Sequence, residues 1–154
     1  MMMTLCCDVL KKLEGKTLVT AESCTGGGIG AALTAIPGSS KVYKGGIISY
    51  TNDVKTGQLG VSAELLDRVG AVSKEVAEAM AIGAKKTLYA DVAVSVTGLA
   101  GPDGDSFGNP VGTVYIGYAD DQNVSCEEFH FSGSRDAVRE QAICAALQLV
   151  LKMQ

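Results

Sequence analysis

Apolar residues along the chain occur either in short continuous runs or at helical spacing. The short runs predict strands, whereas spacings such as that of Leu5, Val9 and Leu13 predict amphipathic helices. The predicted strands are 17–21, 43–50, 91–96, 111–119 and 124–131. The predicted helices are 2–14, 25–34, 62–69, 73–89 and a last one that opens at Ser134 or Asp136. The buried side chains expected in the helix over 73–89 are Val76, Ala77, Met80, Ala81 and Ala84.

The order of these elements predicts an α/β protein. Helices alternate with strands over most of the chain, which is typical of parallel pairing, but Asp120-Asp121-Gln122-Asn123 between two late strands is a hairpin signal. The sheet is therefore expected to be mixed. We predict a three-layer α/β/α sandwich of about five strands, formed by residues 1–154 as a single domain.

Composition narrows the possible partners. The net charge is −4 and no basic cluster is present, so we expect no direct binding to nucleic acid. We see no leader and no apolar run long enough for a membrane span, which predicts a cytoplasmic protein without a membrane partner. Five cysteines without Cys-x-x-Cys spacing and a single histidine, His130, predict reduced thiols and no metal site.

The stretch from Thr20 to Gly30 is the first candidate for chemistry. It places Ser23 on a strand-to-helix turn, where α/β proteins put reactive groups. We expect Thr25 to cap the following helix, and its first N–H groups to be free for an oxyanion or a phosphate. The alternative is that this small, Gly-rich turn serves only to pack a helix tightly against the sheet.

Two later segments are candidates for ligand contact. Residues 97–110 follow a central strand and are rich in glycine and proline, which is typical of a ligand loop. Arg135 and Arg139 lie in the first turns of the last helix, where they oppose the helix dipole. They form either a solvated face or, for Arg135, a contact to an anionic ligand.

Several stretches together resemble the C-terminal domain family of the competence/damage-inducible protein CinA. The matching motifs are AESCTGG (21–27), PGSS (37–40), GGIISYTN (45–52) with Lys55, LGV (59–61), GAVS (70–73), VTGLAGP (96–102) and PVGT (110–113). They occur in the family's order and span nearly the whole chain. One loop departs from the family pattern, because Asp105 and Asn109 stand where a glycine and a lysine are expected, which puts the substrate in question.

The resemblance implies an anticodon-binding-domain-like fold with one antiparallel strand. It also implies an amidase of pyridine nucleotide salvage, which hydrolyses nicotinamide mononucleotide to nicotinic acid mononucleotide and ammonia without a cofactor. Ser23 would be the nucleophile, Lys55 the base and Tyr50 the partner of Lys55. The candidate substrate-binding residues are Gly26, Gly27, Ser39, Asn52, Thr97, Gly98 and Arg135. We also expect a homo-oligomer, a dimer or higher.

Amide hydrolysis by these residues sets physical conditions. Lys55 acts as a base only when it is neutral, so it must be desolvated or lie beside a positive field such as the helix end at Gly26. The N–H groups around Gly26 and Gly27 would stabilise the oxyanion. Glu22 should point to the opposite face of its strand and support structure, and Cys24 is a rival nucleophile that alternation directs away from Ser23.

Other interpretations remain open at this point. Apart from the resemblance, Lys55 reads as a surface lysine and Tyr50 as a half-buried strand aromatic, and Ser39 either caps a helix or binds phosphate. A non-catalytic nucleotide-binding or protein-interaction module, linked to competence or DNA damage, is the alternative function. An amidase for a related pyridine or nucleotide carboxamide is a third.

Overall fold

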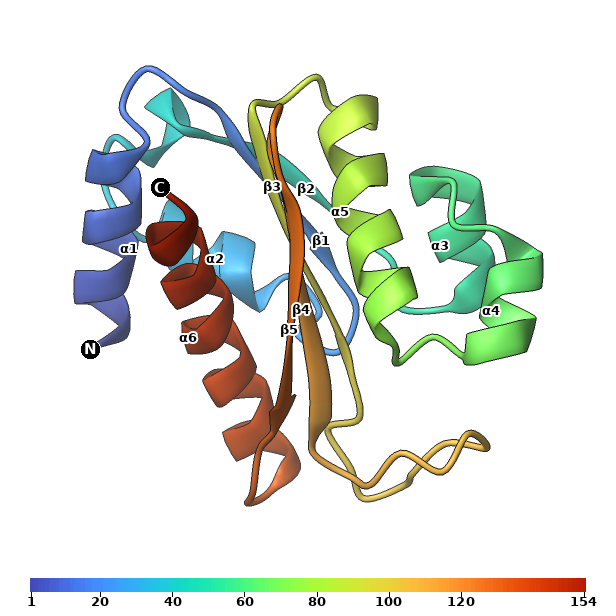
Figure 1. The fold of residues 1–154 in the computed structure, drawn as a ribbon. Coiled ribbons are helices and arrows are strands. Elements are labelled where there is room, and N and C mark those ends of the chain that lie inside the picture. The colour runs from blue at the N-terminus through green and yellow to red at the C-terminus, as the bar shows by residue number, and fades with distance from the viewer.

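The computed structural model describes all 154 residues, which form helices on both sides of one sheet (Figure 1). The strands are β1 (Leu18–Glu22), β2 (Tyr43–Ile48), β3 (Val92–Gly98), β4 (Thr113–Ala119) and β5 (Val124–His130). The helices are α1 (Met2–Lys12), α2 (Gly28–Thr34), α3 (Asn52–Leu59), α4 (Ala63–Val69), α5 (Lys74–Thr87) and α6 (Arg135–Met153), with a 3₁₀ turn, η1 (Ser39–Lys41).

The sheet has the strand order β2-β1-β3-β4-β5. β1 pairs in parallel with β2 and with β3, whereas β4 runs antiparallel to both of its neighbours, β3 and β5. The carboxyl ends of β1, β2 and β3 therefore meet at one edge, while β4 alone runs in the opposite direction. This arrangement confirms the predicted mixed five-stranded sheet and the late hairpin.

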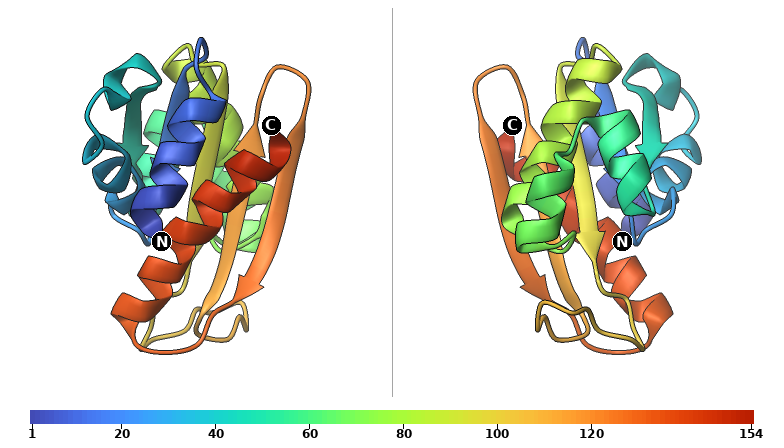
Figure 2. Two further views of the ribbon diagram at one scale, coloured as in Figure 1. Left: turned by 90° about the vertical axis from the view of Figure 1, so that its left-hand side faces the viewer. Right: turned by 90° about the vertical axis from the view of Figure 1, so that its right-hand side faces the viewer.

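The helices form two layers, one on each face of the sheet (Figures 1 and 2). α1, α2 and α6 cover one face around a core that includes Leu18, Val94 and Leu147. α3, α4 and α5 cover the other around Val19 and Met80. Leu18 and Val19 are adjacent yet belong to different cores, because successive side chains of a strand point to opposite faces.

Two helices illustrate where periodicity succeeds and where it fails. The five residues predicted to be buried on α5 are those that the structure buries on that helix. α3 carries no comparable apolar stripe, since only Lys55 and Leu59 are buried on it, and no helix was predicted over these residues. The short α3 matters because it carries Lys55.

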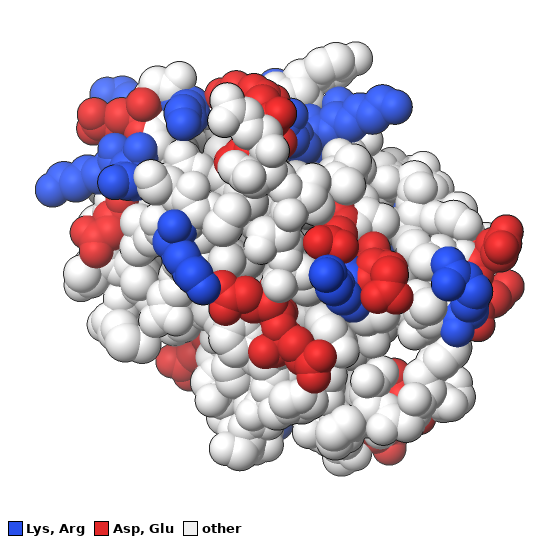
Figure 3. Space-filling model, viewed as in Figure 1, with Lys and Arg blue, Asp and Glu red and all other residues white.

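The surface shows no strong segregation of charge on the face seen in Figure 3, where acidic and basic side chains are interspersed. None of the helices combines the length and the apolar character that a membrane crossing requires. All five cysteines are free thiols.

Candidate active site

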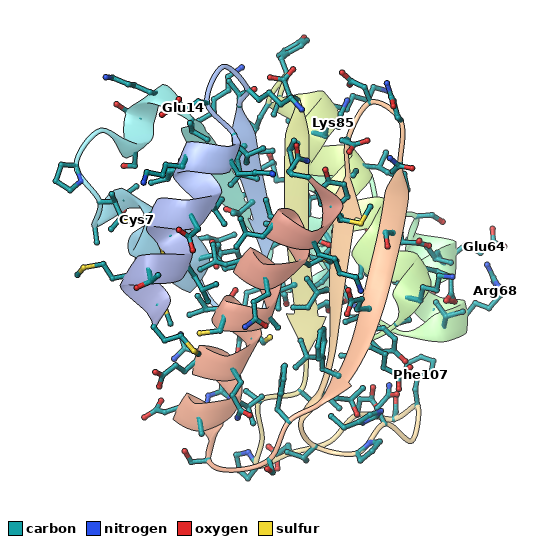
Figure 4. The ribbon with its side chains drawn as sticks, turned by 60° about the vertical axis from the view of Figure 1, so that its left-hand side comes forward. Cys7, Glu14, Glu64, Arg68, Lys85 and Phe107 are labelled. Atoms are coloured by element: carbon teal, nitrogen blue, oxygen red, sulfur yellow. The ribbon has the colours of Figure 1, made fainter.

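A cavity of about 420 Å³ lies at the edge of the sheet where β1, β2 and β3 end. Its lining combines residues of the strand ends with the long loop after β3, whose Phe107 side chain lies near the lower end of the sheet in Figure 4. Seven of the predicted site residues line it: Ser23, Tyr50, Asn52, Lys55, Thr97, Gly98 and Arg135. The loop over 97–110, expected to contact a ligand, forms much of one wall.

Ser23 lies directly after β1, on the face covered by α3 and α5. The strand alternation places Val19 and Ala21 in the core on that face, and Ser23 continues the series. Its N–H donates to the carbonyl of Val96 in the neighbouring strand (3.0 Å), which extends the sheet pairing by one residue. The position of the hydroxyl is therefore set by the sheet itself.

Lys55 reaches Ser23 from the first turn of α3. Its Nζ lies 3.0 Å from Ser23 Oγ, 2.8 Å from the carbonyl oxygen of Ser49 and 3.4 Å from that of Tyr50. The side chain is 1% exposed, and no carboxylate lies within ion-pair distance of it. Burial lowers the pKa of Lys55 to about 8, since a buried ammonium loses its hydration.

The three partners of Lys55 determine whether an N–H bond or the lone pair of its amine faces Ser23. A neutral amine has two N–H bonds and one lone pair, and the two main-chain carbonyls can only accept hydrogen bonds. With both N–H bonds directed at Ser49 and Tyr50, the lone pair is left for the hydroxyl of Ser23. The arrangement is therefore suited to taking a proton from Ser23 Oγ.

Tyr50 differs from expectation in how it approaches Lys55. Its main-chain oxygen, and not its phenol, is the group beside Nζ. The phenol accepts a hydrogen bond from Arg135 Nη2 (3.0 Å), and Arg135 Nη1 donates to the carbonyl of Gly101 (2.7 Å). Arg135 thus joins the start of α6 to the loops after β2 and β3 at the rim of the cavity.

The turn after Ser23 is organised differently from the predicted capped helix. α2 begins only at Gly28, so the prediction that Thr25 caps it is wrong. Thr25 Oγ1 instead donates to Glu22 Oε1 (2.7 Å), and the same carboxylate accepts the N–H groups of Ile29 (2.9 Å) and Gly30 (3.0 Å). Because the carboxylate of Glu22 already occupies the amino end of α2, this helix end supplies no free positive field to Lys55.

The two glycines proposed to stabilise the oxyanion lie outside the cavity lining. The N–H of Gly26 donates to the carbonyl of Ser23 (3.0 Å) within the turn, and Gly27 is the left-handed residue that precedes α2. The N–H groups of Cys24, Thr25 and Gly27 donate to no other residue, and of these three residues Cys24 lines the cavity. Cys24 and Thr25 directly follow Ser23, and they were not predicted as main-chain donors because a sequence does not show which N–H groups a turn uses.

Cys24 points away from the face that holds Lys55. Its side chain belongs to the core between the sheet and α1, α2 and α6, as alternation predicts. It is 6% exposed, and burial raises the pKa of its thiol to about 11. A thiol with so high a pKa holds very little thiolate near neutral pH, which disfavours it as the nucleophile.

The second wall of the cavity comes from the segment 70–73, which contributes Ala71 and Val72 and was not predicted to belong to a site. Thr97 Oγ1 donates to the carbonyl of Ala71 (2.8 Å), and Asn109 Nδ2 donates to that of Val72 (3.2 Å). The ring of Phe107 lies against Gly70, where a Cβ atom would come within 2.6 Å of it. The end of β3, through Thr97, and the loop after it, through Phe107 and Asn109, therefore both contact this segment.

The two loop residues that depart from the family pattern bind each other. Asp105 accepts hydrogen bonds from the N–H of Phe107 (3.1 Å), the N–H of Asn109 (3.1 Å) and Asn109 Nδ2 (2.7 Å). Partial burial raises the pKa of Asp105, but these hydrogen bonds outweigh that effect and lower it below the ordinary value. Asp105 therefore acts within the loop, as the acceptor that closes it.

Two remaining predictions fall outside the cavity. Ser39 begins η1, before β2, and so lies at the amino end of the strand whose carboxyl end borders the cavity. His130, at the end of β5, contacts Glu128 and Thr113. No group of three or more His, Cys, Asp or Glu side chains is placed to hold a metal ion.

Comparison with known proteins places this chain in a family. The family profile described as the CinA C-terminal domain matches residues 2–154. The chain is 50% identical over 136 residues to the nicotinamide-nucleotide amidohydrolase PncC of Pseudomonas putida, covering 88% of this chain and 85% of that protein. It is 51% identical over 138 residues to a CinA-like protein of Thermosynechococcus vestitus, covering 88% of this chain but 33% of that protein.

Solved structures agree with the sequence relationship. A CinA superfamily protein from Escherichia coli matches with a TM-score of 0.97 and 35% identity, over 100% of this chain and 91% of that one. A competence/damage-inducible protein from Agrobacterium tumefaciens matches with a TM-score of 0.95 and 39% identity, over 99% and 94% of the two chains. The chain, which spans about a third of the length of the CinA-like relatives, belongs to the CinA C-terminal domain family.

Proposed function

We propose that the chain is an amidase that hydrolyses nicotinamide mononucleotide to nicotinic acid mononucleotide and ammonia. The observation that carries this proposal is the buried contact between Lys55 Nζ and Ser23 Oγ, at the side of a cavity of about 420 Å³. A nucleophile paired with a base of lowered pKa is the usual requirement for acyl transfer. The name of the Pseudomonas putida relative, a nicotinamide-nucleotide amidohydrolase, supports the choice of substrate.

The proposed reaction begins with transfer of a proton from Ser23 to neutral Lys55. Ser23 Oγ attacks the carboxamide carbon, and the N–H groups of Cys24 and Thr25 stabilise the oxyanion that forms. Lys55 then gives its proton to the amide nitrogen, the C–N bond breaks and ammonia leaves. Water, deprotonated by Lys55, hydrolyses the acyl-serine, and the proton returns to Ser23 Oγ.

Arg135 is the proposed anchor for the nucleotide. It is exposed at the rim, and three of its five N–H groups remain after the two that bind Gly101 and Tyr50 are counted as used. Guanidinium groups bind phosphate well because their geometry matches its oxygens. Asn52, Thr97 and Gly98 line the same cavity and are proposed to contact the ribose or the pyridine ring.

The remaining expectations fit this proposal. We propose that residues 1–154 act as one amidase domain, in the cytoplasm, on a free nucleotide, with neither nucleic acid nor membrane as partner. The five free thiols are consistent with a reducing compartment. Assembly into a homo-oligomer stays a prediction, which light scattering of the purified protein would test.

A panel assay for ammonia release tests the proposed function. Nicotinamide mononucleotide, nicotinamide riboside and nicotinamide are compared with the wild-type protein and with Ser23→Ala. We expect turnover of the mononucleotide, weaker turnover of the riboside, and none with Ser23→Ala. Faster turnover of the riboside or of nicotinamide would mean that this compound, and not the mononucleotide, is the substrate. Binding of the mononucleotide without any ammonia release would favour a non-catalytic module.

A further inference from the structure

Arg139 binds the turn that carries the nucleophile. It lies in the second turn of α6, and its side chain is half-buried. Nε donates to the carbonyl of Cys24 (3.0 Å) and Nη2 donates to the carbonyl of Thr25 (3.3 Å). Arg139 has no carboxylate partner within ion-pair distance, so its hydrogen bonds go to these two successive carbonyls of the turn.

The opposite side of the same turn is held by Glu22. Its carboxylate accepts the hydroxyl of Thr25 and the first N–H groups of α2. Arg139 therefore binds two carbonyl groups of the turn, whereas Glu22 binds the hydroxyl of Thr25 and two N–H groups of α2. Because neither residue reaches Ser23 Oγ, any effect on the reaction must pass through the main chain between Ser23 and Gly28.

The geometry of the peptide group links Arg139 to the site. A carbonyl and the N–H of the next residue share one plane and point in opposite directions. Since the carbonyl of Cys24 faces Arg139, the N–H of Thr25 faces away from it. The carbonyl of Ser23 accepts the N–H of Gly26, so the N–H of Cys24 is likewise directed out of the turn. Neither of these two N–H groups donates to another residue.

We propose that Arg139 is a positioning residue for the amidase reaction, which holds the Cys24 and Thr25 peptide groups so that their N–H groups serve as the oxyanion donors. This inference rests on the proposed function. Arginine suits the task because its planar fork binds two carbonyls at once, which a lysine does not reproduce. The positive charge of Arg139 also acts on the turn. It lowers the pKa of the Cys24 thiol and so offsets part of the burial effect, which raises that pKa to about 11.

The kinetic test uses Arg139→Met and Arg139→Lys, with Arg68→Met as the matched control. Arg68 is exposed on α4 and projects away from the sheet in Figure 4. For Arg139→Met we expect kcat for ammonia release to fall by about 10-fold or more, because loss of one oxyanion donor costs roughly 100-fold. KM should change far less, and free guanidinium ion should restore part of the loss. Arg139→Lys should fall between wild type and Arg139→Met.

A second measurement separates this inference from the choice of substrate. A fluorophosphonate probe forms a P–O bond with Ser23 Oγ while the P–F bond breaks, fluoride leaves and Lys55 takes the proton. Its rate, followed by intact mass, depends on the oxyanion donors but on no nucleotide. We expect slower labelling of Arg139→Met, an unchanged rate for Arg68→Met and no labelling of Ser23→Ala.

The outcomes are distinguishable. If the wild type is labelled but releases no ammonia from nicotinamide mononucleotide, the proposed substrate is wrong. The labelling rates of the variants then still test the role of Arg139. Labelling of folded Arg139→Met at the wild-type rate would overturn the inference. A rise in the KM of Arg139→Met with unchanged kcat would also overturn the inference, because it assigns Arg139 to substrate binding. A wild-type protein that does not react with the probe would overturn it too. If Arg139→Met does not melt cooperatively, the kcat, KM and labelling rate of Arg139→Lys are compared with those of the wild type instead.

Discussion

Lys55 Nζ lies 3.0 Å from Ser23 Oγ, although 32 residues separate the two in the chain. The contact is buried and contains no histidine, and the other partners of the amine are main-chain carbonyls. Since burial lowers the pKa of Lys55 to about 8, a useful fraction of the amine is neutral near neutral pH.

The first prediction distinguishes the two neighbouring nucleophiles. Ser23→Ala should reduce ammonia release by about 10⁴-fold or more, as removal of a nucleophile does in other hydrolases. Cys24→Ala should retain most of the activity, because the thiol lies in the core and its pKa is raised to about 11. Steady-state assays on both variants check this, with Cys126→Ala as the thiol control.

The assignment fails under one clear result. If Cys24→Ala is folded and inactive while Ser23→Ala keeps its turnover, the thiol is the nucleophile. Thermal melting of each variant establishes that the loss of activity is not a loss of fold.

The second prediction concerns Tyr50, whose phenol binds Arg135 and not Lys55. Tyr50→Phe should raise KM modestly, because one hydrogen bond contributes about 0.5–1.5 kcal/mol. The pH profile should keep its midpoint. In a double-mutant cycle, Tyr50→Phe and Arg135→Lys should be less than additive, since they remove the same contact. A shifted midpoint in Tyr50→Phe would instead make the phenol the proton partner of Lys55.

The third prediction concerns the loop after β3, which Asp105 closes through three accepted hydrogen bonds. Asp105→Ala should free the loop and raise KM on the order of several-fold, with a smaller effect on kcat, because binding loops position substrate. Asp67→Ala, an exposed change on α4, serves as the control. If KM falls for nicotinamide mononucleotide, Asp105 acts chiefly as a charge that repels phosphate.

The fourth prediction follows from the pKa of Lys55 through the pH dependence of stability. The folded pKa of about 8 lies below the ordinary value of 10.5, so between these two values the unfolded chain binds a proton that the folded chain lacks. Stability attributable to Lys55 therefore rises with pH across this window and is lowest below about 8. Denaturant unfolding of the wild type, relative to Lys55→Met, should show this gain.

Subtracting Lys55→Met removes the contributions of other groups that titrate at high pH. A difference in unfolding free energy that stays constant from about pH 8 to about 10.5 would mean that Lys55 has an ordinary pKa in the folded protein.

Much of the fold could be predicted because it depends on local patterns. The continuous apolar run of β3, the stripe of α5 and the hairpin at 120–123 each leave a signal in a few consecutive residues. Strand alternation even separated Glu22 from Ser23, and the structure places them on opposite faces. The resemblance to the CinA C-terminal domain family supplied the role of Lys55, which periodicity alone did not.

The parts that could not be predicted depend on contacts between distant segments. α3 has almost no apolar stripe, so nothing local indicates that it lies over the end of β1. The start of α2 is set by Glu22, whose carboxylate takes the place of a capping side chain at Gly27. The contact of Arg139 with the turn joins residues more than a hundred positions apart, and no spacing rule reports it.

The pH profile of ammonia release is the measurement that tests the central claim most directly. If neutral Lys55 takes the proton of Ser23, kcat for nicotinamide mononucleotide should rise with pH through an apparent pKa of about 8, and Lys55→Arg should be inactive at every pH although it keeps the positive charge. A folded Lys55→Arg protein with near wild-type turnover and an unchanged profile would contradict the account.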